Sequence, residues 1–276
     1  MQRTSHPHRG FTLVELAVVL FIVGILMLGV MSTLSSQAEQ RNFEETRRRL
    51  EQARELLLSF AIVNGRLPCP ATAASAGDES PAGGNCTTAF SGWLPARTIG
   101  FQQTDTAGYA IDSWGNRIRY AVSMATPYNS QTPRVCRPVA ATTLPVTPHF
   151  TSKDNMKANG IDCQPNDLLI CKSANPPTAA PAFAGAAITA TTCGGASNQI
   201  VTTSLVVAVI FSTGKNGAFA TCATCVDEAA NLDGNATFVF HPPASGSAAN
   251  GEFDDQLIWI TVGEFYGKLI SAGVLP

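Results

Sequence analysis

The chain has 276 residues, enough for one large domain or two small ones. Only 14% of the residues are charged and the formal net charge is −2, so the chain lacks the basic character of nucleic-acid-binding proteins and we predict no nucleic-acid partner. Charge is dense in residues 39–55, whereas the later chain is rich in Ala, Thr, Ser, Gly and Pro. That composition favours short strands joined by many turns.

The first predicted element is an apolar run from Phe11 to Val30, in which Glu15 is the one charged residue. A helix of about 20 residues is as long as a bilayer core is thick, so we predict a membrane span at 11–31. A carboxylate inside such a span is costly and usually has a partner.

A secretory signal peptide and an ordinary membrane anchor are the first two interpretations of this run. A signal peptide would be cleaved near Ser36-Gln37-Ala38, but the run exceeds the roughly 7–15 apolar residues of such signals. A membrane anchor would leave Glu15 unexplained. The arginines that follow the apolar run, Arg41 and 47–49, also disfavour a cytoplasmic N-terminus, which is the orientation that the cysteines require.

Gly10, followed by Phe-Thr-Leu-Val-Glu-Leu at 11–16, resembles the class III signal of type IV pilin-like proteins. The resemblance implies that a prepilin peptidase removes the leader 1–10 by cutting between Gly10 and Phe11. It also implies N-methylation of Phe11 and retention of the apolar helix.

The new amino group on Phe11 would supply the cationic partner that Glu15 lacks. Within one chain that amine lies about one turn from Glu15, and in a filament the amine of one subunit would instead meet Glu15 of a neighbour. Glu15 is therefore predicted to act in assembly. Loss of either member of a buried pair costs about 3–5 kcal/mol. The implied partners are other pilin or pseudopilin subunits, an inner-membrane assembly platform and the inner membrane itself.

The helix is predicted to continue to about residue 64, giving an N-terminal helix over 11–64. Leu50, Ala53 and Leu57 recur at helical spacing, and Asn64-Gly65 supplies a stop. Residues 65–276 are then expected to form a disulfide-rich head domain in the periplasm or outside the cell.

The stretch "DSWGNRIRYAVS" at 112–123 is similar to the Asp-Pro-Trp-Gly-Asn-Pro-Tyr segment of major pseudopilins of type II secretion. Asp112 is expected to cap a turn through its side chain, and Gly115 to take a positive φ. Ser113 and Arg117 stand where the family has prolines, so the match is partial.

Further strands are predicted at 167–172, 204–212, 237–241 and 256–262, with 204–212 as the central one and a C-terminal helix over 262–272. The segments 124–166 and 173–203 show little periodicity and are expected to be loops. The predicted fold class is α+β: one long N-terminal helix packed on a mostly antiparallel sheet.

Eight cysteines follow the apolar run, which indicates disulfides in an oxidising compartment. They are Cys69, Cys86, Cys136, Cys163, Cys171, Cys193, Cys222 and Cys225. Sequence neighbours are the simplest pairs, namely Cys69 with Cys86, Cys163 with Cys171 and Cys222 with Cys225. The lone Cys222-Ala-Thr-Cys225 motif lacks the second pair that a zinc site needs, so a structural disulfide is favoured.

Acidic residues recur late in the chain, at Asp227, Glu228, Asp233, Asp254 and Asp255. Major pseudopilins bind calcium near the matching part of the chain, but only Asp254 and Asp255 align with that loop, and loosely. We therefore assign no metal ligands and no cofactor, with calcium left open.

We predict no enzyme, because His149 and His241, the imidazoles outside the leader, belong to no recognisable catalytic motif. The predicted function is a structural subunit, a minor pilin or pseudopilin of a type IV pilus-like or type II secretion filament. It would start as a single-pass inner-membrane protein with a periplasmic head and end in the filament. A membrane-anchored binding or adhesion protein and a secreted enzyme are the alternatives.

Overall fold

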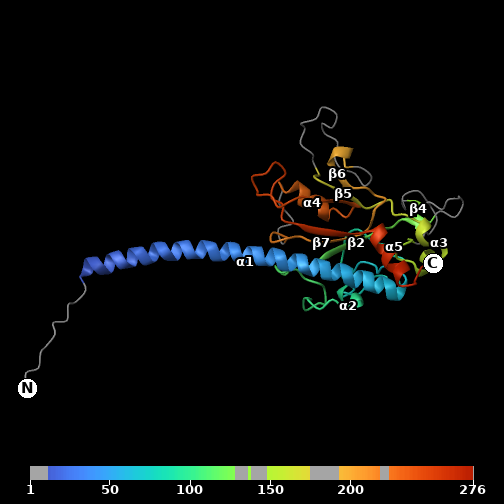
Figure 1. Cartoon of the computed structure of the whole chain (residues 1–276), viewed down its shortest axis with the longest axis horizontal. Helices are drawn as coiled ribbons and strands as arrows, with labels where there is room; N and C mark the ends of the chain where they lie inside the picture. The colour runs from blue at the N-terminus through green and yellow to red at the C-terminus, as the bar shows by residue number, and fades with distance from the viewer. Residues whose placement is uncertain (1–11, 128–135, 138–147, 175–192, 218–223, 276) are drawn as a thin grey trace, which may run out of the picture. The chain divides into compact units, whose positions relative to one another are not determined.

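A computed structural model of the chain describes residues 12–127, 136–137, 148–174, 193–217 and 224–275, without the side chains of 27–36, 126–127 and 136–137. Two compact units divide the chain, Met1–Glu44 and Glu45–Pro276. The second unit is α+β, as predicted, and Figure 1 labels several of its elements.

The N-terminal helix α1 spans Leu13–Asn64, close to the predicted 11–64. In the second unit its apolar stripe is buried: Leu50, Ala53 and Leu57 are fully inaccessible to solvent. The helix ends at Asn64, whose side chain donates to the carbonyl of Phe60, and Gly65 follows with a φ of 70°. That left-handed conformation favours glycine, which explains the stop.

The main sheet has the strand order β1-β2-β7-β9 and is antiparallel throughout. Its strands are β1 (Gly92–Trp93), β2 (Arg119–Val122), β7 (Val206–Ser212) and β9 (Gln256–Thr261). Every residue of β7 is buried, and the strand lies between β2 and β9, which confirms the predicted central strand. All four strands predicted at 167–172, 204–212, 237–241 and 256–262 are present.

Both faces of the main sheet are covered. Alternate residues of β7 face opposite sides: Ala208 and Ile210 join the core formed with α1 and α5, whereas Val209 and Phe211 join a second core. Helix α5 (Val262–Ser271) follows β9 directly and contributes Phe265 to the first core. This period-two alternation is what a strand buried on both sides requires.

A smaller sheet with the order β6-β5-β8 lies on the second core. Its strands are β5 (Leu169–Cys171), β6 (Gln199–Val201) and β8 (Thr237–Val239), and β5 pairs with β8 in parallel. The remaining described elements are α2 (Ala96–Ile99), β3 (Thr126–Pro127), β4 (Cys136–Arg137), α3 (Lys153–Asn159), η2 (Gly160–Asp162), η3 (Ala196–Asn198) and α4 (Val226–Leu232). Several of these elements lie in segments that the sequence predicted to be loops. The prediction missed them because elements of two to seven residues leave no periodic pattern.

Two disulfides are fully described. Cys69 is bonded to Cys86, as predicted, but Cys171 is bonded to Cys193, so the predicted pair of Cys163 with Cys171 is wrong. Cys171 is the last residue of β5. Strand β6 follows Cys193 in the chain and pairs with β5. Strand pairing brings these cysteines together across 22 residues, which proximity in sequence does not reveal.

Cys163 and Cys225 are also disulfide-bonded. The side chain of Cys136 and the whole of Cys222 lie outside the described residues, so the predicted Cys222–Cys225 pair stays a prediction.

The turn at Asp112–Asn116 forms as predicted. Asp112 Oδ1 accepts hydrogen bonds from the backbone N–H groups of Trp114 (2.9 Å) and Asn116 (2.8 Å), and Gly115 has a φ of 88°. Asn116 Nδ2 then donates to the carbonyl of Gly214 at 2.6 Å, which ties this turn to the turn that follows β7.

The predicted membrane span at 11–31 stays a prediction. Over the part of the chain with described structure, no helix has both the length and the apolar character to cross a membrane. Phe11 and the side chains of 27–31 lie outside that part.

Candidate functional site

The first candidate site is the start of α1, where Glu15 lies in the first turn. The backbone N–H of Thr12 donates to Glu15 Oε2 at 2.9 Å, and the Thr12 hydroxyl donates to the same oxygen at 3.0 Å. The backbone N–H of Glu15 donates back to Thr12 Oγ1 at 3.3 Å. This is a capping box, in which each residue satisfies the other's backbone N–H group.

The surface that follows Glu15 is apolar and exposed. Leu13 and Val14 are 85% and 70% accessible, and Phe21 is 70% accessible. A row of uncovered large apolar side chains marks a surface that contacts a partner or a membrane. The predicted cleavage and methylation residues, Gly10 and Phe11, lie outside the described residues, so their roles stay predictions.

The second candidate site is a cluster of three buried carboxylates, Glu228, Asp254 and Asp255. One carboxylate oxygen of each residue lies within 4.8 Å of the others. Glu228 is on α4, whereas the two aspartates directly precede β9. The structure thus adds Glu228 to the pair that the sequence aligned with a calcium loop.

Among the hydrogen bonds described for these carboxylates, the donors are neutral groups. Asn216 Nδ2 donates to both oxygens of Glu228, at 3.0 and 2.9 Å. Asp254 Oδ2 accepts from the backbone N–H groups of Lys215 (2.9 Å) and Asn216 (3.2 Å). Asn231 Nδ2 donates to Asp255 Oδ2 at 2.7 Å. Neutral donors orient the carboxylates but do not cancel their charge.

The protein surroundings disfavour ionisation of all three acids. Burial, followed by the negative charge of Glu228, raises the pKa of Asp254 to about 7. Burial likewise raises the pKa of Asp255 well above its usual range, and burial raises that of Glu228. Like charges held close together in a dry site have this effect.

Asp254 Oδ1 is buried and accepts no hydrogen bond from the described residues. The residue is only 6% exposed, so solvent does not satisfy this oxygen. Gly214, with a φ of 62°, packs directly against it: a Cβ at position 214 would lie 2.0 Å from Asp254 Oδ1. The glycine therefore makes room for the carboxylate.

These features fit a hard divalent cation. Carboxylate oxygens are the ligands that Ca²⁺ prefers, and a cation would satisfy the orphaned oxygen of Asp254. Glu228, Asp254 and Asp255 are the residues that would hold it. Bound there, the ion would supply positive charge that links the three side chains.

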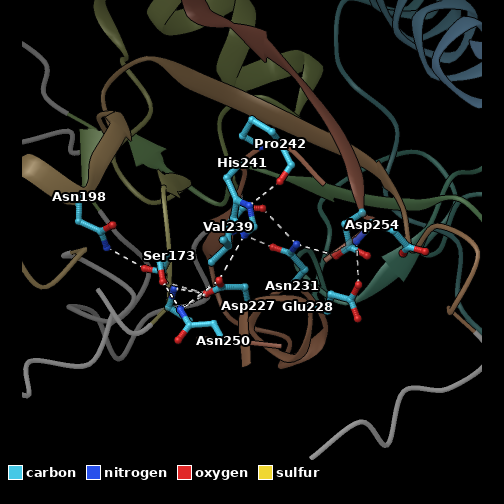
Figure 2. Close-up of polar contacts among 12 residues, drawn as sticks. Ser173, Asn198, Asp227, Glu228, Asn231, Val239, His241, Pro242, Asn250 and Asp254 are labelled. Carbon is cyan, nitrogen blue, oxygen red and sulfur yellow. Dashed lines mark hydrogen bonds and ion pairs between the residues drawn. The ribbon is translucent and has the colours of Figure 1, made fainter. Parts of the chain in front are cut away.

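A neighbouring polar network contains a serine, an aspartate and a histidine, the residue types of a hydrolase triad, but their hydrogen bonds connect them in a different order. Asp227 lies at its centre (Figure 2): Ser173 Oγ donates to Asp227 Oδ1 at 3.0 Å, and His241 Nε2 lies 3.2 Å from Asp227 Oδ2. Asn250 Nδ2 donates to Asp227 Oδ2 at 3.1 Å and to Ser173 Oγ at 2.6 Å. The serine hydroxyl donates to the carboxylate rather than to the imidazole, so the order is Ser–Asp–His and differs from that of a hydrolase triad.

The other imidazole outside the leader, that of His149, lies in the core. His149 is fully buried, and its Nε2 lies 3.2 Å from the hydroxyl of Tyr266. Tyr266 in turn donates to the carbonyl of Cys163. Asp233, the remaining acid of the predicted late group, caps the loop before β8 by accepting from Asn235 N–H at 2.9 Å.

Comparison with known proteins bears on the first site. The family model of the prokaryotic N-terminal methylation motif matches residues 5–31, and this motif is the signal of type IV pilins and pseudopilins. No curated protein and no solved structure matches the chain. The motif supports a protein of the pilin or pseudopilin type and a structural subunit rather than an enzyme.

Proposed function

We propose that the chain is a minor subunit of a type IV pilus-like or type II secretion filament, assembled through the N-terminal part of α1. The observation that carries the proposal is the methylation motif at 5–31, which runs from before Leu13 into the first part of a helix of 52 residues. The motif implies processing by a prepilin peptidase and assembly with other pilin subunits.

Before assembly, the chain resides in the bacterial inner membrane with its head in the periplasm. The peptidase cuts between Gly10 and Phe11 and methylates the new amine. The exposed apolar side chains near Glu15 then pack against neighbouring subunits, guided by the assembly platform. Such packing is heterologous and leaves an open-ended helical filament.

Glu15 sets the register of this packing. In the isolated chain its carboxylate is held by Thr12, which orients it at the helix N-terminus. In the filament it pairs with the Phe11 amine of a neighbour, and a subunit without the carboxylate leaves that buried amine unpaired. The minor role follows from the size of the unit Glu45–Pro276, because many heads of this size would crowd a filament.

The test compares Glu15→Val, Glu15→Gln and wild type for incorporation into sheared filaments, with each subunit quantified by mass spectrometry. A loss of about 3 kcal/mol corresponds to a decrease of more than about 100-fold for both variants. Glu44→Gln is the matched control, because Glu44 is an exposed glutamate of the same helix. Normal incorporation of Glu15→Val contradicts the proposal. Normal incorporation of Glu15→Gln alone would mean that the cap, and not the charge, is what assembly needs.

A further inference from the structure

We infer that Arg119 binds a carboxylate side chain of a partner protein, on a surface formed by Trp93, Tyr109, Arg117 and Arg119. These four residues, the arginine surface, come from β1, from β2 and from the segment that precedes β2. The inference goes beyond the proposed function, because it concerns the head and not the assembly helix.

Arg119 carries a charge that no acidic side chain of the chain neutralises. All 20 acidic residues lie among the described residues, and none of them forms a salt bridge with Arg119 in the described structure. The residue is half-buried. Burial, followed by the positive charge of Arg117, lowers the pKa of Arg119. Its surroundings within the chain therefore oppose its charge, and an anion from outside would relieve that cost.

The other buried or half-buried arginines with described side chains all have an acidic partner. The pairs are Arg49 with Glu45, Arg54 with Glu264, Arg66 with Glu79 and Arg117 with Asp105. Arg119 is thus the exception among the described arginines that are removed from solvent. A cation that a fold leaves unpaired in this way is suited to a charge that another molecule brings.

Aromatic rings hold the two guanidinium groups of the arginine surface in place. Trp93 lies directly opposite Arg119 in the pairing of β1 with β2, and the guanidinium carbon of Arg119 is 5.0 Å from the centre of the indole ring. The guanidinium carbon of Arg117 lies 4.0 Å from the centre of the Tyr109 ring. Such cation–π contacts restrict the side chains, so little freedom remains to be lost when a ligand binds.

Most hydrogen-bond donors of Arg119 are available to a ligand. Within the described structure, its one hydrogen bond runs from Nη1 to the carbonyl oxygen of Ser91, at 3.3 Å. None of its nitrogen atoms is both buried and without a partner, so the unbonded ones are accessible to solvent. A guanidinium has five N–H donors in a planar fork, which matches the two oxygens of a carboxylate.

The charge and composition of the arginine surface favour a protein carboxylate over a polyanion. Asp105 neutralises Arg117 at 2.7 Å, which leaves one net positive charge and suits one carboxylate. Nucleic acids instead require several cations along a groove or a stripe. Tryptophan, tyrosine and arginine are also the residue types that contribute most to the binding energy of protein interfaces.

The test measures binding of fluorescein-labelled hexaglutamate to the full chain in zwitterionic detergent micelles, by fluorescence anisotropy at low salt. We expect binding that weakens as the salt concentration rises, and no binding of hexaglutamine. Arg119→Gln should weaken the binding of hexaglutamate by about 10-fold or more. The absence of binding by wild type, or an unchanged affinity in Arg119→Gln, overturns the inference.

Arg97→Gln is the matched control, because Arg97 is an exposed arginine that already pairs with Asp78. It should bind hexaglutamate within about twofold of wild type. A loss equal to that of Arg119→Gln would mean that general positive charge attracts the peptide, and it would contradict a specific site. Arg119→Lys keeps the charge but lacks the planar fork, so it should also bind more weakly than wild type. Wild-type affinity in that variant overturns the role of the guanidinium.

Thermal unfolding separates a binding residue from a structural one. Arg119→Gln breaks no ion pair within the described structure, so Tm should stay within about 4 °C of wild type. A larger decrease would show that the fold itself depends on Arg119 and would contradict its assignment to a partner.

A short DNA duplex tests the other class of ligand. Binding that is tighter than that of hexaglutamate and that requires Arg119 would assign the arginine surface to nucleic acid and overturn the inference. None of these outcomes bears on Glu15, so this inference and the proposed function fail separately.

Discussion

Thr12 and Glu15 cap the same helix end reciprocally, with the Thr12 N–H 2.9 Å from Glu15 Oε2 and the Glu15 N–H 3.3 Å from Thr12 Oγ1. The two residues stand three apart, the spacing of a capping box. The acid that looks out of place in an apolar run therefore has a role in the chain itself, before any partner subunit is present.

The capping box predicts opposite outcomes for two substitutions of Thr12. Thr12→Val removes the hydroxyl and should destabilise the first turn of α1 by about 1 kcal/mol, whereas Thr12→Ser keeps the cap. Hydrogen exchange of the amides of 13–16 in detergent micelles measures the difference. Equal exchange rates in the two variants would contradict the role of the hydroxyl.

The buried ion pair of Arg66 and Glu79 should contribute strongly to the stability of the head. Arg66 contacts both oxygens of Glu79, at 2.6 and 2.8 Å, and both side chains are 9% exposed. Burial opposes ionisation of Glu79, but Arg66 and two backbone N–H groups hold its pKa below the usual value. Glu79→Ala should lower the free energy of unfolding by about 3–5 kcal/mol, measured with urea, because Arg66 is left unpaired.

Asp78, the preceding residue, provides the control. It pairs with Arg97 at 3.7 Å, and both side chains are more than half exposed. Asp78→Ala should change the free energy of unfolding by no more than about 1 kcal/mol. Similar losses in the two variants would argue against a special contribution from the buried pair.

His149 predicts how stability depends on pH. Burial lowers the pKa of His149 from 6.5 to about 4, although a backbone hydrogen bond involving Gly160 opposes the shift. Between pH 6.5 and pH 4 the unfolded chain binds a proton at this residue that the folded chain does not. The contribution of neutral His149 to the free energy of unfolding is therefore complete above pH 6.5. It is lost as the pH falls from 6.5 to 4, which lowers the free energy of unfolding by up to about 3 kcal/mol.

Urea unfolding at several pH values, on wild type and His149→Gln, measures this contribution. The two curves of unfolding free energy against pH should run parallel above pH 7 and converge toward pH 4, because glutamine does not titrate. Parallel curves over the whole range would show that His149 ionises equally in both states.

The bond between Cys171 and Cys193 predicts a specific peptide map. Digestion without reduction should release a peptide pair that joins these two cysteines, and a Cys163–Cys171 pair would contradict the structure. Replacement of both residues by serine should cost about 2–4 kcal/mol of stability. The bond closes a loop across 22 residues, so the loss comes mainly from the freedom gained by the unfolded chain.

The sequence predicts those elements whose signals are local. The apolar stripe of Leu50, Ala53 and Leu57 indicates the buried face of α1, and the apolar run at 204–212 indicates the central strand. Asp112 and Gly115 specify their turn through a side-chain cap and a positive φ, both properties of the residues themselves.

The acidic cluster and the second disulfide depend instead on tertiary packing. Glu228 and Asp254 are 26 residues apart. They meet because Glu228, on the seven-residue helix α4, and Asp254 both bond to the turn after β7. A helix of that length leaves no clear periodic pattern. Cys193 lies close to Cys171 because β5 pairs with β6, and the local sequence of neither strand predicts this pairing. The one signal of the cluster in the sequence was the recurrence of acidic residues between Asp227 and Asp255.

Intact-mass and N-terminal peptide analysis of the mature protein from its native membrane tests the central claim most directly. We expect a chain that begins at Phe11 and carries one additional methyl group on its amino terminus. A chain that begins after Ala38, or one that retains Met1–Gly10, would contradict the assignment of this protein as a processed filament subunit.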